Sequence, residues 1–145
     1  MNHLRRALTA ALVLAIVRPL GALAAWNKEA FGAKTPGDAL KNLGVPNGAP
    51  SSELVIDAPQ IAENGAVVPI EISSAIAGTS ALIVLIEKNP FPLTARFDFK
   101  EGAAPFVKLN VKMGETSEVR VIAEAGGKHY AASKEIKVTI GGCGG

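Results

Sequence analysis

Short segments in which apolar and polar residues alternate recur along the chain, and they restrict its possible folds more than any other feature. Successive side chains of a β-strand point to opposite faces, so each segment predicts a strand with one buried face. The segments are 68–72, 95–99, 107–113, 119–124 and 136–140, and a short apolar stretch at 54–57 precedes them. Gly126-Gly127 is a hairpin-turn signal. Closely spaced short strands separated by turns indicate an all-β fold, an immunoglobulin-like antiparallel β-sandwich.

One further segment, Ala81 to Ile86, is apolar on both faces. Strands of antiparallel sandwiches usually keep one polar face. Two interpretations therefore remain open. In the first, this is a central strand with both faces covered, one of them by N-terminal helices. In the second, a partner subunit covers the outer face, because large exposed apolar patches mark interfaces.

The residues before the strands follow a different pattern, which divides the chain into four parts. Trp26 to Leu43 is predicted to form short helices, with Thr35 as an N-cap and Pro36 at the first helical position. A loop rich in glycine and proline follows at 44–50. We expect a leader at 1–24, a helical segment and loop at 25–50, a β-sandwich at 51–140 and a flexible tail at 141–145.

The first residues have the three parts of a secretory signal peptide. A basic start with Arg5-Arg6 is followed by an apolar run from Ala7 to Val17 and by Ala22-Leu23-Ala24, whose small residues suit a signal peptidase. Arg18-Pro19 ends the run before it is long enough to span a membrane. The alternative is an amphipathic N-terminal helix. We expect an exported, periplasmic protein with no membrane association after cleavage, and the arginine pair is compatible with the twin-arginine route.

The charge of the chain argues against a nucleic-acid partner. The whole sequence has 15 basic and 13 acidic residues, but three of the arginines lie in the leader. Cleavage leaves 12 basic and 13 acidic residues, a net charge of −1. A nucleic-acid-binding protein needs a basic face to neutralise phosphates, and this sequence supplies none.

The single cysteine, Cys143, lies between two glycine pairs. The flanking residues are Gly141, Gly142, Gly144 and Gly145. Glycine has the widest backbone freedom and no side chain to bury, so the pattern predicts a thin, mobile segment that projects from the last strand. No Lys or Arg adjoins the thiol and no helix begins nearby, so nothing lowers its pKa for catalysis. The arrangement favours a thiol that is delivered to another protein, with a reach of roughly 13 Å from the sandwich.

Three functions compete for this thiol: a covalent carrier, a structural module joined by an intermolecular disulfide, and an enzyme that acts alone. The missing activating charge disfavours the enzyme. A metal site is disfavoured because Cys143 and the distant His129 are fewer than the usual number of ligands. His129 is either a base for Cys143 or a surface histidine, and its place at the other end of the last strand favours the surface.

The terminal Gly-Gly-Cys-Gly-Gly motif resembles that of the SoxY family, the sulfur-carrier subunits of bacterial thiosulfate oxidation. The leader with its arginine pair and the β-rich body agree with this resemblance. So does the segment Glu87 to Leu93, which is similar to the Asn-Pro-x-Pro loop of that family at Asn89, Pro90, Phe91 and Pro92.

The resemblance implies a substrate carrier that is not itself an enzyme and needs no cofactor. It implies a heterodimer with a SoxZ-like β-sandwich subunit. It further implies that a c-type cytochrome enzyme conjugates thiosulfate to Cys143 as a cysteine S-thiosulfonate, and that a sulfate-releasing hydrolase and a sulfane dehydrogenase then act on the product. Gly141, Gly142, Gly144 and Gly145 would be the flexible flanks. The loop from Asn89 to Pro92 is a candidate partner contact, in which Phe91 either docks a partner or caps the core.

Overall fold

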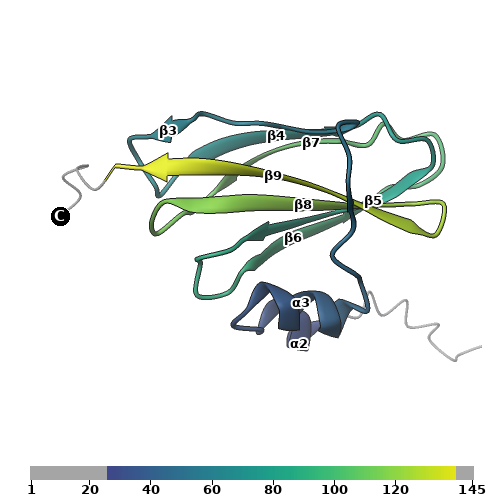
Figure 1. Cartoon of the computed structure of the whole chain (residues 1–145), viewed down its shortest axis with the longest axis horizontal. Coiled ribbons are helices and arrows are strands. Elements are labelled where there is room, and N and C mark those ends of the chain that lie inside the picture. Colours follow the sequence, from purple (N-terminus) through teal and green to yellow (C-terminus); the bar gives the residue numbers. More distant parts are fainter. Residues whose placement is uncertain (1–25, 140–145) are drawn as a thin grey trace, which may run out of the picture.

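The computed structural model describes residues 26–139, which form two short helices and two β-sheets (Figure 1). The helices are α2 (Lys28–Phe31) and α3 (Pro36–Leu43). The strands are β1 (Ala49–Pro50), β2 (Leu54–Asp57), β3 (Ile61–Ala62), β4 (Val68–Ser74), β5 (Thr79–Ile86), β6 (Leu93–Asp98), β7 (Phe106–Val111), β8 (Ser117–Ala125) and β9 (Lys128–Val138). The predicted leader and the predicted tail, with Cys143, lie outside the described residues.

The two sheets form a sandwich. The larger sheet has the order β1-β9-β8-β5-β6, with β3 also paired to β9, and the smaller sheet has the order β2-β4-β7. All pairs between the longer strands are antiparallel. The predicted fold class, an immunoglobulin-like β-sandwich with short N-terminal helices, is confirmed. One detail differs, because β1 and β3 pair with β9 in parallel.

The main core lies between the two sheets. Alternate residues of β4, β5 and β8 are fully buried there, as the period of two predicts. The fully buried side chains include Ile70, Ile72, Leu82, Val84, Ile86, Val119 and Val121. Burying one such side chain contributes about 1.5–3 kcal/mol, so this layer is the main source of stability.

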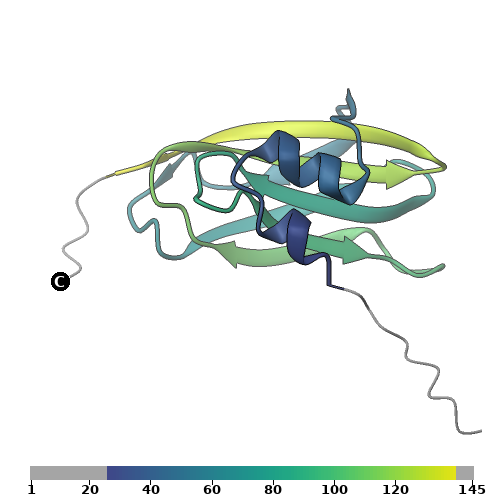
Figure 2. The ribbon, with the colours of Figure 1, turned by 90° about the horizontal axis from the view of Figure 1, so that it is seen from below.

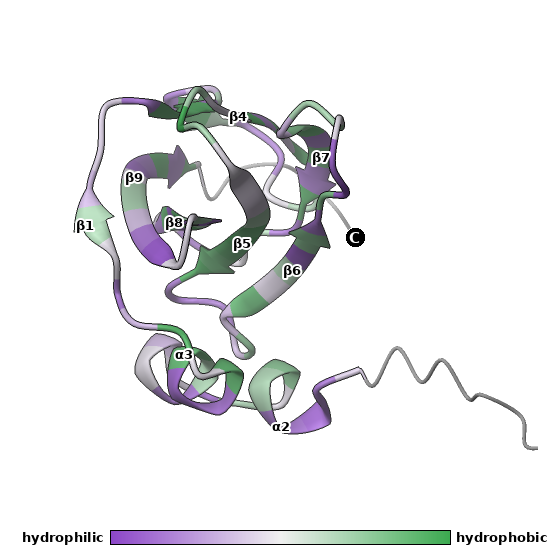
Figure 3. Ribbon diagram, turned by 90° about the vertical axis from the view of Figure 1, so that its right-hand side faces the viewer, coloured by the Kyte–Doolittle hydropathy of each residue, from purple (hydrophilic) through white to green (hydrophobic). Residues whose placement is uncertain are grey.

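The second face of β5 is buried under the helices. Ile83 and Leu85 pack with Ala30, Ala39 and Leu40 in a separate apolar cluster. Figure 2 shows both helices lying across this sheet, and Figure 3, a view along the sandwich, places them on its outer side. The first interpretation of the doubly apolar segment is therefore confirmed: it is a central strand that the chain's own helices cover.

The helices are held by specific caps. Thr35 Oγ1 accepts a hydrogen bond from the Asp38 amide at 3.1 Å, and Pro36 opens α3, as predicted. The helix ends at Gly44, whose φ of 69° is the left-handed conformation that glycine adopts without strain. Asn27 caps α2 and also donates to the Asn42 carbonyl at 2.9 Å, which ties the two helices together.

The longest strand, β9, follows a tight hairpin. Gly126 and Gly127 have φ values of 55° and 75°, the positive pair that a type I′ turn requires. From this turn β9 runs the length of the sandwich beside β8 and ends at Val138 (Figure 1). The strand therefore connects the hairpin at one end of the molecule with the start of the predicted tail at the other.

Candidate functional site

The candidate site is the end of the sandwich at which β9 finishes, which we call the β9 end. Thr139 is the last described residue there, four positions before Cys143. Three connections surround it at the left of Figure 1: the β3–β4 loop, the β5–β6 loop and the β7–β8 loop. Cys143 and its glycines lie outside the described residues, so the structure defines the root of the tail and its neighbours.

The root is held by backbone hydrogen bonds on its β3 side. The Lys137 amide donates to the Gln60 carbonyl at 3.0 Å, and the Thr139 amide donates to the Ala62 carbonyl at 3.1 Å. Between them, the Val138 amide donates to Thr116 Oγ1 of the β7–β8 loop at 3.0 Å. Three successive amides are thus satisfied by two different segments, which fixes the direction in which the chain leaves the sandwich.

Gly65 brings the β3–β4 loop against the same root. The Met113 amide donates to the Gly65 carbonyl at 2.7 Å. A Cβ atom added at Gly65 would overlap the Met113 carbonyl oxygen and lie 2.9 Å from Val138 Cγ1. A residue without a side chain is therefore required for this close approach, which packs the loop directly on β7–β8 and β9.

The β5–β6 loop, with the predicted partner contact, is tied to the β7–β8 loop. Asn89 Nδ2 donates to the Lys112 carbonyl at 2.7 Å, and Asn89 Oδ1 accepts from the Gly114 amide at 3.4 Å. Pro92 is buried, whereas Pro90 and Phe91 are exposed. Asn89 and Pro92 thus hold the loop, and Pro90 and Phe91 are its outward surface.

Phe91 is half-exposed, and the ammonium group of Lys34 lies over its ring. Its relative exposure is 50%, and Lys34 Nζ lies 3.6 Å from the ring centroid. Phe91 belongs to neither apolar cluster of the described residues. Its side chain therefore lies outside the core.

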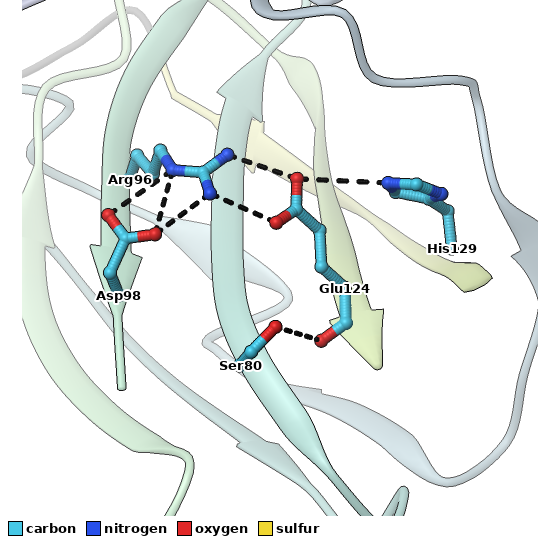
Figure 4. A network of polar contacts seen from close by, with 5 residues as sticks. All are labelled: Ser80, Arg96, Asp98, Glu124 and His129. Carbon is cyan, nitrogen blue, oxygen red and sulfur yellow. Dashed lines mark hydrogen bonds and ion pairs between the residues drawn. The ribbon is translucent and has the colours of Figure 1, made fainter. Parts of the chain in front are cut away.

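His129 lies far from the root, in a polar network at the hairpin end (Figure 4). Its Nε2 is 3.7 Å from Glu124 Oε1, and its side chain is only 22% exposed, so it is more buried than the predicted surface histidine. From His129 to Val138 the strand covers about 30 Å at roughly 3.3 Å per residue. A role as the base for Cys143 does not agree with this separation.

The centre of that network is Arg96. Its Nη1 and Nη2 donate to the two carboxylate oxygens of Glu124 at 3.0 and 2.9 Å, and its Nε donates to Asp98 at 3.0 Å. The hydrogen bonds to Glu124, more than those to Asp98, raise the pKa of the guanidinium above its usual value. The network joins β6 to β8 across β5.

Other kinds of site have no support within residues 26–139. No group of three or more His, Cys, Asp or Glu residues there could hold a metal ion. In the same part of the chain, no helix is long and apolar enough to cross a membrane.

The fold and the site define a class of protein: an immunoglobulin-like β-sandwich with a firmly held last strand that leads toward a lone cysteine. A family model described as sulfur oxidation protein SoxY matches residues 41–143, a range that ends at Cys143. The chain belongs to the SoxY family. Family membership gives it a role in sulfur oxidation, as part of the Sox system.

Solved structures agree with this assignment. The sulfur carrier protein SoxY from Chlorobium limicola f thiosulfatophilum matches with a TM-score of 0.63 and 37% identity, over 70% of this chain and 92% of that chain. The superoxide reductase (neelaredoxin) from Ignicoccus hospitalis matches with a TM-score of 0.53 and 21% identity, over 61% of this chain and 83% of that chain, a similarity of fold alone. No curated protein matches the sequence.

Proposed function

We propose that the chain is a covalent carrier of sulfur intermediates, which bind to Cys143 and are presented there to partner enzymes. The observation that carries the proposal is the family match, which extends through Cys143. The firmly held root at Thr139 supports it, because a carrier benefits from a body that aims its attachment point. The related Chlorobium protein is described as a sulfur carrier.

The proposed cargo is thiosulfate, bound as a cysteine S-thiosulfonate. Joining the thiol to thiosulfate forms a sulfur–sulfur bond and releases one proton and two electrons, which a c-type cytochrome enzyme accepts. Water then cleaves the terminal sulfonate as sulfate and leaves a persulfide on Cys143, and a sulfane dehydrogenase oxidises that sulfur further. The carrier needs no cofactor for these steps, because the partner enzymes supply the chemistry.

A non-catalytic role agrees with the groups that hold the root. Val138 and Thr139 are held by the Thr116 hydroxyl and the Ala62 backbone carbonyl, neither of which is a proton acceptor suited to activating a thiol. His129, the only histidine of the described residues, belongs to the network at the opposite end. Activation of the thiol is therefore assigned to the receiving enzymes.

The proposal includes export and a permanent partner. The leader at 1–24 directs the chain to the periplasm, where the sandwich pairs with a SoxZ-like β-sandwich subunit. A surface suited to such a subunit lies between β6 and β7, the edge strands of the two sheets on one side of the sandwich. The inward side chains there, including Phe97 and Leu109, stay only partly buried, and a second sandwich would complete their burial.

The test is the intact mass of the protein purified from its own host during growth on thiosulfate, before and after a reductant. We expect a reducible addition of sulfur and oxygen. Fragmentation should locate it on Cys143, and the Cys143→Ser variant should lack it. The alternative function is an exported structural module, supported only by the lone cysteine. It predicts an unmodified thiol or a protein–protein disulfide, and that outcome would overturn the carrier proposal.

A further inference from the structure

The distance between the root and the cysteine restricts where a partner of Cys143 can bind. Cys143 lies four positions after Thr139, and a fully extended chain covers at most about 13 Å over that distance. Thr139 itself is fixed by its hydrogen bond to Ala62. A protein that reacts with Cys143 inside a cleft must therefore bring the rim of that cleft against the β9 end.

The β9 end presents exposed apolar side chains to such a rim. Six large apolar side chains are exposed in the described part of the chain: Trp26, Val55, Ile61, Val67, Phe91 and Phe106. Three of them, Ile61, Val67 and Phe91, lie on the segments that surround the root, with exposures of 55%, 54% and 50%. We call these three residues the apolar collar.

The collar residues stand on segments that are already ordered. Ile61 lies in β3, opposite Lys137 of β9, and Val67 directly precedes Val68, which pairs with Val111. Phe91 lies between two prolines in the loop that Asn89 ties down. Exposed apolar groups on ordered backbone lose little entropy when a partner covers them, so their burial contributes to binding with little cost of ordering.

A positive charge accompanies the collar. Lys34 Nζ lies over the Phe91 ring, and Lys34 takes part in no ion pair of the described residues. A partner surface that covers Phe91 also approaches this ammonium group. The complementary surface is therefore apolar with a carboxylate near the position of Lys34.

We propose that the apolar collar is the docking surface for the enzymes that receive Cys143, and that each presents an apolar, partly acidic rim around its cleft. This inference rests on the proposed carrier function. The short tether makes contact at the β9 end unavoidable, and the exposed side chains make that contact favourable. The collar supplies affinity without contacting the reacting sulfur, so one surface serves several enzymes.

The chain offers matched controls for the test. Phe91→Ser and Val67→Ser remove collar side chains, whereas Trp26→Ser and Val55→Ser remove an aromatic and a valine side chain, 66% and 50% exposed, that lie outside both the collar and the β6–β7 surface. Each variant replaces the original protein in its host, and the initial rate at which the adduct appears on Cys143 after thiosulfate addition is followed by intact mass. We expect a rate about 5- to 10-fold lower for the collar variants, which corresponds to the loss of a central apolar contact, and rates within about twofold for the controls.

Further readouts separate the possible outcomes. Alkylation of Cys143 by iodoacetamide should be equally fast in all variants, and the SoxZ-like subunit should copurify with all of them. An unmodified Cys143 in the original protein would overturn the carrier function itself. Equal loading of all variants would overturn the docking role of the collar alone. Loss of the copurifying subunit, a change in self-association, or slower alkylation in the collar variants would also overturn that role, because each would explain slower loading in another way.

Discussion

Gly65 shows how one residue can control the root of the tail. Its φ is not in the left-handed region, so the requirement for glycine comes from space rather than from backbone conformation. The Met113 carbonyl and Val138 Cγ1 occupy the volume that any side chain would need. Both neighbours belong to segments that are themselves hydrogen-bonded, so neither can move without breaking contacts at the root.

We therefore expect Gly65→Ala to destabilise the protein by about 1–3 kcal/mol, the usual cost of an added group in a tightly packed place. Urea unfolding measures the effect. Gly37→Ala is the matched control, because nothing lies within 4 Å of its added Cβ and the residue is in α3, where alanine is the better helix former. Equal stability of the two variants would show that the loop adjusts freely.

At the scale of elements, Arg96 joins three strands of the larger sheet. Ala81 of β5 lies opposite both Asp98 of β6 and Glu124 of β8. Its small side chain leaves room above β5 for the guanidinium to bridge the two carboxylates (Figure 4). The planar guanidinium binds both oxygens of Glu124, and it thereby fixes the edge strand β6, which has a strand neighbour on one side only.

Replacing Arg96 should loosen this edge. We expect Arg96→Lys to lower the free energy of unfolding by about 1–2 kcal/mol, because lysine keeps the charge but loses the paired hydrogen bonds. Lys108→Leu is the control, since it removes an exposed ion pair with Glu71 on the other sheet. Its free energy of unfolding should equal that of the original protein in the same urea unfolding experiment. Stability of Arg96→Lys equal to that of the original protein would mean that charge alone holds β6.

Elements with a clear period could be predicted from the sequence, and those that depend on register could not. The alternating segments predicted the longer strands, and Thr35-Pro36 predicted the start of α3. The two-residue strands β1 and β3 are too short to show any period, and they form only because β9 lies beside them. The Arg96 network likewise appears only when the register places Asp98 and Glu124 opposite the same residue.

The same division applies to the candidate site. The Cys143 motif and the loop at Asn89 to Pro92 are visible in the sequence because of their composition. The support around the root is not, since Thr116, Ala62 and Gly65 act through contacts between segments distant in sequence. Asn64-Gly65 is a turn signal, but a turn signal does not indicate that the glycine must lie against Met113.

At the scale of the whole molecule, β9 runs between two ends that differ in their contacts. The hairpin and the Arg96 network occupy one end, the helices cover one face, and the root with its three loops occupies the other end (Figure 1). This arrangement keeps the hairpin and the Arg96 network away from the root, and the helical segment reaches the loops around the root through Lys34 on Phe91. It also makes the reach of Cys143 depend on a short segment between Thr139 and the cysteine.

A change in the length of that segment should therefore affect loading without affecting the fold. Deletion of Gly141 and Gly142 reduces the greatest reach from about 13 Å to about 7 Å, at roughly 3.3 Å per residue. We expect adduct formation on Cys143 in the host to fall more than about tenfold, because effective concentration collapses when a linker cannot span its two sites. Alkylation by iodoacetamide should stay fast, since a small reagent needs no reach. The double variant Gly141→Ala, Gly142→Ala keeps the length and restricts the backbone. Normal loading of that variant would identify length as the deciding property. Normal loading of the deletion variant would contradict docking at the β9 end, because the enzymes would then reach the thiol despite the shortened segment.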